Sequence, residues 1–259
     1  STLLRILAGV YRPDSGRVLI NGQAPFENEQ VKRSTVFISD YPYLAPTATV
    51  RRLARLYRSV YPGWSEDYFA RMEKLFPISF DARLGKMSKG MQRQAAILLG
   101  LSTQPRCILF DEIFDGLDPV VRELVKKLLV DFVAENGASV MIASHNLREL
   151  EDVCDHVGLL HRGGALCEDD LDRLKLGITR VQFALADPEN FETVRSGLHL
   201  LKCSQQGKLF EMTVRGTETE TLALVQRLHP LFCETLPITL EELFISEMEV
   251  AGYDINKVI

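Results

Sequence analysis

The amino-acid sequence predicts an α/β fold: a mostly parallel sheet core with a helical subdomain, followed by a small C-terminal α+β domain. Residues 106–110 and 139–143 are short apolar runs of the kind that a parallel sheet buries on both faces. A helix predicted between them completes a strand–helix–strand unit with a right-handed crossover. The pattern changes near residue 172, which predicts one domain over residues 1–172 and another over residues 178–259.

The first domain is expected to begin with a helix over residues 2–10. Residues 17–22 alternate in polarity and end in an Asn-Gly pair, which favours a tight hairpin. Residues 34–38 are apolar and predict a buried strand. The helical subdomain is expected at about residues 41–101, where amphipathic segments are separated by proline and glycine.

Three helix ends carry clear signals. Asp118 is the predicted cap of the helix between the two apolar runs, Pro119 is its first residue and Gly137 follows its last turn. In the second domain, Thr239 and Glu242 predict a capping box for the final helix. The other elements expected there are strands at residues 178–185, 199–204 and 208–215 and helices at residues 189–196 and 218–228.

Bulk composition is that of a globular protein, with 46% hydrophobic and 25% charged residues. The net charge of -5 and the lack of a strongly basic domain argue against a nucleic-acid-binding protein. The five cysteines are scattered without metal-binding spacing, which fits a reducing compartment. No apolar run reaches the length of about 18 residues that indicates a membrane span.

Two carboxylates follow the first apolar run. Residues 107–112 read Cys-Ile-Leu-Phe-Asp-Glu, so Asp111 and Glu112 are expected at the carboxyl edge of the sheet, where open α/β folds bind ligands. Asp111 could hold Mg²⁺, and Glu112 could polarise the water that attacks a γ-phosphate. Acidic pairs after strands are also common without such a role, so this pair alone leaves both interpretations open.

A histidine at the end of the next strand favours the catalytic interpretation. A tight turn at residues 114–119 follows the carboxylates, and the strand of residues 139–143 leads into Ser144 and His145. A histidine at the end of a neighbouring parallel strand can reach the same phosphate. A lone histidine is more commonly a core residue, but in this arrangement we expect His145 to be catalytic together with Glu112.

A second phosphate-binding candidate is the segment Ser88-Lys89-Gly90-Met91-Gln92, which opens a predicted helix. The Ser88 side chain can cap this helix, and Gly90 lets a ligand approach the backbone closely. The first-turn N–H groups would then form an anion site that the helix dipole strengthens. An ordinary helix cap is the alternative, and for this segment alone it is the simpler explanation.

Taken together, these motifs resemble, across residues 1–165, the ATPase subunit of an ATP-binding cassette (ABC) transporter. The resemblance implies a P-loop NTPase fold of the RecA-like type for the sheet core. Ser1 and Thr2 are similar to the end of the Walker A loop. The further matches are the signature motif at residues 88–92, Walker B at 110–112, the D-loop at 116–118 and the switch histidine at His145.

The resemblance also implies a function, the hydrolysis of ATP with Mg²⁺ to power a membrane transporter of the export type. The implied partners are a second ABC ATPase subunit and an integral membrane permease, without nucleic acid, at the cytoplasmic face of the cell membrane. Glu112 and His145 would be catalytic, and Ser1, Asp111 and Asp40 would bind the metal. The nucleotide would contact Ser1, Thr2, Ser88, Lys89, Gly90, Met91, Gln92 and Asp118.

The sequence departs from the family pattern at several positions. Lys89 stands where glycine is usual and Met91 where glutamine is usual, a form similar to that of ABC ATPases paired with export-type permeases. Lys89 either adds a positive charge near the γ-phosphate or is simply solvated. Asp40 stands where the Q-loop carries glutamine, and its carboxylate could still bind Mg²⁺ or a metal-bound water.

The phosphate loop G-x-x-x-x-G-K-[ST] is represented only by its final serine, Ser1. That loop supplies most contacts to the β- and γ-phosphates. We therefore expect that the sequence starts inside this loop, through an incomplete gene model or a cut boundary. The 259-residue chain is expected to bind ATP poorly, to fold badly and to be inactive, whereas the complete protein would be an ATPase.

Two other functions remain open. One is a non-catalytic ABC-like protein that holds or regulates a partner. The other is a soluble ABC ATPase that is not linked to transport, which a single cassette without a heptad run does not favour. The transported substrate cannot be read from these residues, because its recognition belongs to the permease.

Overall fold

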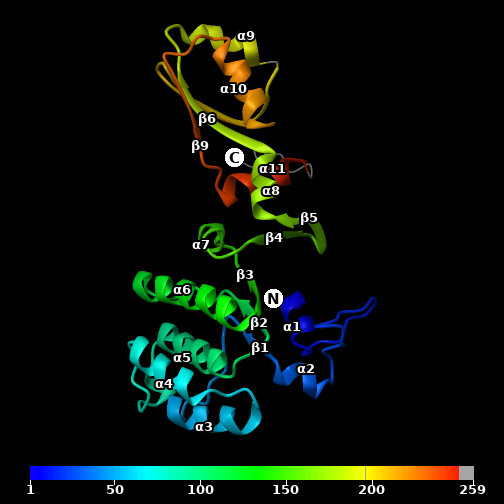
Figure 1. Cartoon of the computed structure of the whole chain (residues 1–259), viewed down its shortest axis with the longest axis vertical. Coiled ribbons are helices and arrows are strands. Elements are labelled where there is room, and N and C mark those ends of the chain that lie inside the picture. Colours follow the sequence, from blue (N-terminus) through cyan, green and yellow to red (C-terminus); the bar gives the residue numbers. More distant parts are fainter. Residues whose placement is uncertain (196, 251–259) are drawn as a thin grey trace. The chain divides into compact units, whose positions relative to one another are not determined.

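The computed structural model describes residues 1–195 and 197–250, and the chain divides into two compact units, Ser1–Val153 and Cys154–Ile259 (Figure 1). Each unit has a hydrophobic core of its own. The units divide after Val153, earlier than the domain boundary expected near residue 172. The difference arises because the β-hairpin of residues 156–170 lies in the second unit. The domain limits taken from the sequence stay a prediction.

The first unit contains the predicted parallel sheet. Its strands are β1 (Thr35–Ile38), β2 (Cys107–Asp111) and β3 (Ser139–Ala143), in the order β1-β2-β3. Both pairs are parallel, with Val36 opposite Ile108 and Ile108 opposite Val140. The carboxyl ends of β2 and β3 therefore meet at one edge of the sheet, as the strand–helix–strand pattern predicts.

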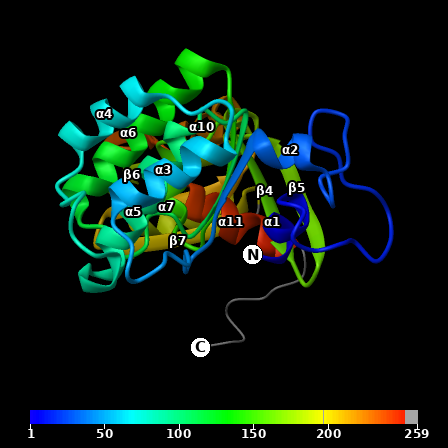
Figure 2. The same cartoon turned by 90° about the horizontal axis from the view of Figure 1, so that it is seen from below.

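Three helices of the first unit form the region predicted to be helical, and a fourth connects β2 to β3 as the predicted crossover. These are α3 (Val50–Val60), α4 (Glu66–Leu75), α5 (Lys89–Ser102) and α6 (Pro119–Asn136), which lie together and away from the N-terminal helices (Figures 1 and 2). Helix α5 is buried along most of its length, and a Cβ on Gly100 would lie 2.9 Å from Val36 Cγ1. A side chain at residue 100 would therefore force Val36 to shift, and glycine avoids this where α5 packs on β1.

The predicted ends of α6 are confirmed. Asp118 Oδ1 accepts hydrogen bonds from the backbone N–H groups of Val120 and Val121, both at 3.1 Å. Gly137 ends the helix in the left-handed conformation with φ 59°, which costs a glycine little. The helix thus begins and ends where its sequence dictates, and it carries the chain from β2 to β3.

The N-terminal segment is less regular than expected. Helix α1 covers Thr2–Leu7 and is shorter than predicted, and the expected hairpin at residues 17–22 is reduced to one bridge between Ile20 and Gln23. Helix α2 (Glu29–Arg33), which the sequence pattern did not predict, precedes β1. The short helices η1 (Leu84–Lys86) and α7 (Leu147–Glu151) complete the unit.

The second unit is an α+β structure. It opens with the antiparallel hairpin β4 (His156–His161) and β5 (Gly164–Asp170), followed by α8 (Leu171–Leu176). Its four-stranded antiparallel sheet has the order β7-β8-β6-β9. The strands are β6 (Ile178–Ala184), β7 (His199–Gln206), β8 (Leu209–Arg215) and β9 (Phe232–Leu236).

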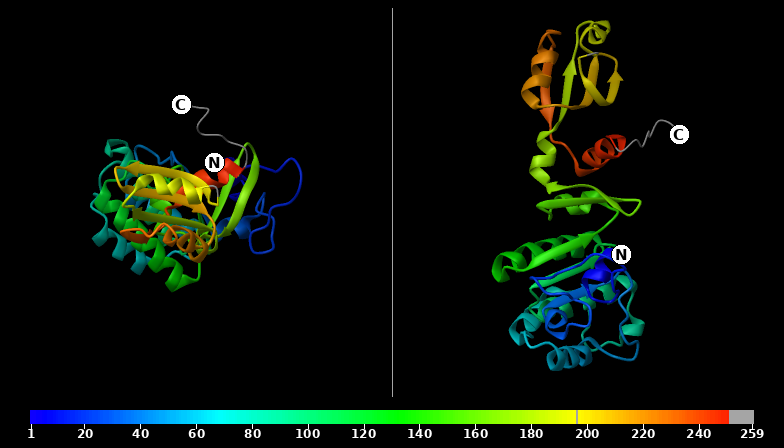
Figure 3. Two further views of the ribbon diagram at one scale, coloured as in Figure 1. Left: turned by 90° about the horizontal axis from the view of Figure 1, so that it is seen from above. Right: turned by 90° about the vertical axis from the view of Figure 1, so that its right-hand side faces the viewer.

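Helices cover one face of this sheet and close the unit. The predicted helix at residues 189–196 is formed by η2 (Pro188–Phe191) and α9 (Glu192–Arg195), and residue 196 lies outside the described residues. Helix α10 (Glu218–Gln226) lies against β6 (Figure 3). The rings of Phe183 on β6 and Phe210 on β8 stack in the core of this unit, with centroids 5.3 Å apart.

The predicted capping box at the last helix, α11 (Leu240–Val250), is confirmed. Thr239 Oγ1 accepts from the backbone N–H of Glu242 at 3.2 Å, and the Glu242 carboxylate accepts from the backbone N–H of Thr239 at 3.0 Å. Residues 251–259 lie outside the described part of the chain. No helix among the described residues is long and apolar enough to span a membrane.

Candidate functional site

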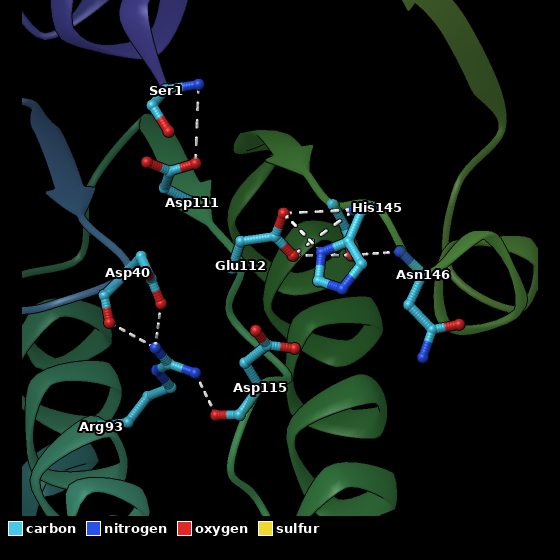
Figure 4. Close-up of polar contacts among 9 residues, drawn as sticks. Ser1, Asp40, Arg93, Asp111, Glu112, Asp115, His145 and Asn146 are labelled. Atoms are coloured by element: carbon cyan, nitrogen blue, oxygen red, sulfur yellow. Dashed lines mark hydrogen bonds and ion pairs between the residues drawn. The ribbon is translucent and has the colours of Figure 1, made fainter.

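The candidate site lies at the carboxyl edge of the parallel sheet (Figure 4). Asp111, the last residue of β2, is 2% exposed. Glu112 follows it with φ 53°, in the left-handed region that residues other than glycine rarely adopt. Such strain persists only where neighbouring structure enforces it, and it is concentrated at functional sites.

The loop after β3 holds the Glu112 carboxylate. His145 Nδ1 lies 2.9 Å from Glu112 Oε1, and the backbone N–H of His145 donates to the same oxygen at 3.2 Å. The Ser144 hydroxyl donates to Oε2 at 3.1 Å. The structure therefore brings together the two residues predicted to be catalytic, and Ser144 is a third member that the sequence analysis did not assign a role.

The Glu112 contact raises the pKa of His145 above its ordinary value of 6.5, through the hydrogen bond first and the charge attraction second. The His145 side chain is 75% exposed, and its ring can donate a proton to, or accept one from, a group that binds beside Glu112. Histidine can change its charge near neutral pH, which suits it to a site where a phosphate charge changes.

Helix α7, directly after His145, is fixed to α6 by two ion pairs. Arg122 on α6 contacts Glu149 at 2.9 Å, and Glu149 is only 5% exposed. Lys126 on α6 contacts Asp152 at 2.7 Å. The loop that carries His145 therefore runs from β3 to a helix that two ion pairs connect to α6.

Asp111 and Ser1 lie at the same edge. The backbone nitrogen of Ser1 is 3.7 Å from Asp111 Oδ1, and Thr2 is the first residue of α1. A buried carboxylate needs a positive partner, and carboxylate and hydroxyl oxygens are the ligands that Mg²⁺ prefers. The donor chemistry of Asp111 and Ser1 therefore fits the predicted metal.

A second group of possible metal ligands surrounds Glu112. One ligand atom each from Glu112, Asp115 and His145 lies within 4.8 Å of the others. Asp115 was not among the residues selected from the sequence. Glu112 and Asp115 are half-buried and His145 is exposed, whereas Asp111 is buried.

The predicted phosphate-binding segment begins α5, as expected. Ser88 Oγ accepts a hydrogen bond from the backbone N–H of Met91 at 3.2 Å, which is the expected helix cap. The Gln92 side chain is already hydrogen-bonded within the protein. Its Nε2 group donates to the backbone carbonyl groups of Leu84 and Met87, both at 3.1 Å. A nucleotide contact through the side chain of Gln92 therefore needs these bonds to open, and its binding role stays a prediction.

Two other predicted nucleotide-binding residues also have partners within the chain. A Cβ on Gly90 would lie 2.3 Å from the carbonyl oxygen of Gly116, so α5 begins directly against the turn after Glu112. The Asp118 carboxylate caps α6. The packing at Gly90 and the helix cap at Asp118 are each a structural reason for the residue found there. The contact of these two residues with a nucleotide stays a prediction.

Asp40 is held by a residue that the sequence analysis missed. Arg93 of α5 lies 2.8 Å from Asp40 Oδ1, and it also donates to the backbone carbonyl groups of Asp40 and Asp115. Lys89, one turn earlier on α5, places its Nζ atom 5.2 Å from the centre of the Tyr41 ring. Lys89 and Tyr41 are both exposed, so both expectations for Lys89, a charge near the γ-phosphate or a solvated side chain, stay open.

Comparisons with known proteins agree with this geometry. Residues 1–115 match the family described as "ABC transporter". The "ABC transporter ATP-binding protein YtrB" of Bacillus subtilis (strain 168) is 28% identical over 247 residues, which cover 95% of this chain and 84% of that protein. The "Nod factor export ATP-binding protein I" of Rhizobium sp. (strain N33) is 29% identical over 65% of this chain and 57% of that protein.

Solved structures give the same result for the fold. The "Structure of ATP binding subunit of ABC transporter" has a TM-score of 0.62 and 25% identity, with 67% of this chain and 75% of that chain covered. This solved structure is an ABC ATP-binding subunit, the class of protein that the sequence motifs resemble. The predicted α/β fold of the P-loop NTPase type is therefore confirmed.

Proposed function

We propose that the chain is an ABC transporter ATP-binding subunit that hydrolyses ATP to power an export-type transporter, because residues 1–115 match the ABC transporter family and the YtrB relative is similar over 95% of the chain. The observation that carries the proposal is the Glu112 carboxylate, held by His145 and Ser144 beside the buried Asp111. The export direction is supported by the Nod factor export relative.

The site residues divide the work of phosphoryl transfer. Ser1 and Asp111 would hold Mg²⁺, with Asp40 as a further candidate, and the ion when bound neutralises charge on the phosphates. Glu112 would orient and polarise the attacking water through the carboxylate oxygen that faces the bound nucleotide. His145 would hold Glu112 in place and donate a hydrogen bond to the γ-phosphate.

The nucleotide would be enclosed by two copies of the site. Ser1 and Thr2 would contact the phosphates in one subunit, and the signature residues would approach from the other. We propose a dimer of ABC ATPase subunits, of like or unlike chains, docked on an integral membrane permease at the cytoplasmic face. The signature residues are Ser88, Lys89, Gly90, Met91 and Gln92, with Asp118 nearby in the D-loop.

The 259 residues do not include the lysine of the G-x-x-x-x-G-K pattern. We propose that this polypeptide by itself binds MgATP weakly, since that lysine and its glycines contact the β- and γ-phosphates. The comparison that tests this uses residues 1–259 and a polypeptide with a G-x-x-x-x-G-K segment joined in front of Ser1. Equally tight MgATP binding by both would contradict the proposal.

The function is tested by phosphate release from MgATP in the extended polypeptide. We expect Glu112→Gln to lower kcat by about 100-fold or more, the usual size of a lost general-base contribution. Lys127→Gln, a change at an exposed residue of α6, is the control and should leave kcat unchanged. Equal rates in the parent and Glu112→Gln would favour the non-catalytic interaction protein.

A further inference from the structure

The loop that follows β1 is attached to α5 by two cationic side chains. Lys89 and Arg93 are four residues apart and therefore lie on one face of the helix. Arg93 contacts Asp40, and Lys89 contacts the ring of Tyr41, the next residue in the loop. Asp40 and Lys89, which both depart from the family pattern, thus take part in two neighbouring contacts between this loop and α5.

Arg93 is the centre of this arrangement. It is 7% exposed, and a buried guanidinium group is stable only when its N–H groups are paired. One terminal nitrogen donates to the Asp40 carbonyl and carboxylate, and the other donates to the Asp115 carbonyl (Figure 4). The planar fork of arginine lets one side chain join two loops, which a lysine cannot do equally well.

The two loops carry residues of the proposed site. The first holds Asp40, and the second is the turn that begins at Glu112 and contains Asp115. Gly90 adds a direct backbone contact, because its Cα faces the Gly116 carbonyl. The first two turns of α5 are therefore packed against both loops, with Arg93 as the polar link between them.

We propose that Arg93 is a positioning residue that locks residues 39–43 and residues 113–117 to the start of α5. Displacing either loop then displaces the other together with Lys89. One consequence of the lock rests on the proposed function: Asp40, Lys89 and Glu112 would respond as one unit when a nucleotide binds. The lock itself is a property of the chain without ligand.

Hydrogen exchange on residues 1–259 tests the lock directly. We expect Arg93→Gln to speed exchange of amides in both residues 39–43 and residues 113–117 by about tenfold, since hydrogen bonds to a charged group are lost in each loop. Arg51→Gln is the matched control, because Arg51 is an exposed arginine whose ion pairs with Glu73 and Asp81 involve neither loop. Unchanged exchange in either loop of Arg93→Gln would overturn the proposal.

Two further variants separate positioning from general destabilisation. Arg93→Lys keeps the charge for Asp40 but loses the fork, so it should restore protection in residues 39–43 and leave residues 113–117 fast. Asp40→Asn should speed exchange less than Arg93→Gln, because the carbonyl contact of Asp40 persists. Equal protection of both loops in Arg93→Lys, or a uniform increase across α3 and α4 in any variant, would contradict a local lock.

Phosphate release by the extended polypeptide then reports on the proposed function separately. If the lock serves catalysis, Arg93→Lys should lower kcat while the KM for ATP changes less than twofold. Faster exchange in both loops of Arg93→Gln, together with no hydrolysis by the parent polypeptide, would overturn the ATPase function and support the lock. Hydrolysis with unchanged loop exchange in Arg93→Gln would support the ATPase function and overturn the lock.

Discussion

At the scale of single residues, the Glu112–His145 pair gives the site a pH dependence. The contact raises the pKa of His145, so the folded protein binds the proton more tightly than the unfolded chain does. The stability from this pair is fully present below the ordinary pKa of 6.5, and it is lost as the pH rises through the raised value. The window for this effect therefore lies at and above pH 6.5.

We predict that Glu112→Gln lowers the pKa of His145 towards its ordinary value, as measured by an NMR titration of the imidazole C–H signals. Asp115→Asn should lower it less, because the charge of Asp115 is a smaller cause of the shift than the contact with Glu112. A larger decrease in Asp115→Asn than in Glu112→Gln would contradict the arrangement of these groups.

A second residue-scale prediction concerns Gly90. In a helix interior, a change from glycine to alanine usually stabilises by about 1 kcal/mol. Here the added Cβ would lie 2.3 Å from the Gly116 carbonyl oxygen, so we expect Gly90→Ala to destabilise by about 1–3 kcal/mol in urea unfolding. Gly158→Ala, where a Cβ would have nothing within 4 Å, should be nearly neutral. Stabilisation by Gly90→Ala would show that this close contact is absent.

Sequence reasoning found the residues whose roles depend on their near neighbours. Ser88 caps α5 through a residue three positions away, and Asp118 caps α6 in the same manner. It missed Arg93, whose partner Asp40 is 53 residues away in the sequence. An arginine within the apolar part of a helix is a usable signal, but its partner is fixed only by the packing of α5 on β1.

At the scale of elements, the caps of α5 and α6 stabilise the two helices that flank the site. We predict that Asp118→Ala lowers the free energy of unfolding by about 1 kcal/mol, whereas Asp118→Asn, which keeps an acceptor, changes it little. Urea unfolding measures both variants. An equal loss in the two variants would mean that the charge of Asp118, and not its capping bond, matters for stability.

Elements with strong patterns were predicted, and short or exposed ones were not. All three strands of the parallel sheet come from apolar runs, and α6 has both of its end signals. Strands β1 and β2 are mostly buried, whereas β3, which was expected to be buried on both faces, has no buried residue. Helices α2 and α7 have only five residues each, too few for a helical period to be visible. The hairpin at residues 17–22 failed because most of its side chains are exposed, so no core fixes its pairing.

At the scale of the whole molecule, two cores predict two responses to damage. Phe132 is fully buried in the core of the first unit, and Phe183 in the core of the second. We predict that Phe132→Ala and Phe183→Ala each cost about 3–5 kcal/mol, in a different part of the chain. Hydrogen exchange after partial urea denaturation should show loss of protection in residues 1–153 for the first variant and in residues 154–250 for the second. Loss across the whole chain in both variants would contradict separate cores.

The antiparallel second unit offers few clues to its function. Arg180 pairs with Glu211 and Glu242, which fixes α11 to the sheet and explains these charges structurally.

Within the part of the chain that the structure describes, the residues proposed for phosphate transfer are concentrated at the edge of the parallel sheet. The central claim is therefore that Glu112 acts in hydrolysis and not in nucleotide binding.

The most direct test of this claim is the identity of the nucleotide that remains bound after incubation with MgATP. The extended polypeptide and its Glu112→Gln variant are incubated, freed of unbound nucleotide, denatured and analysed by chromatography. We predict that Glu112→Gln retains intact ATP, whereas the parent holds ADP or no nucleotide. ADP in both proteins in equal amounts would contradict the role assigned to Glu112.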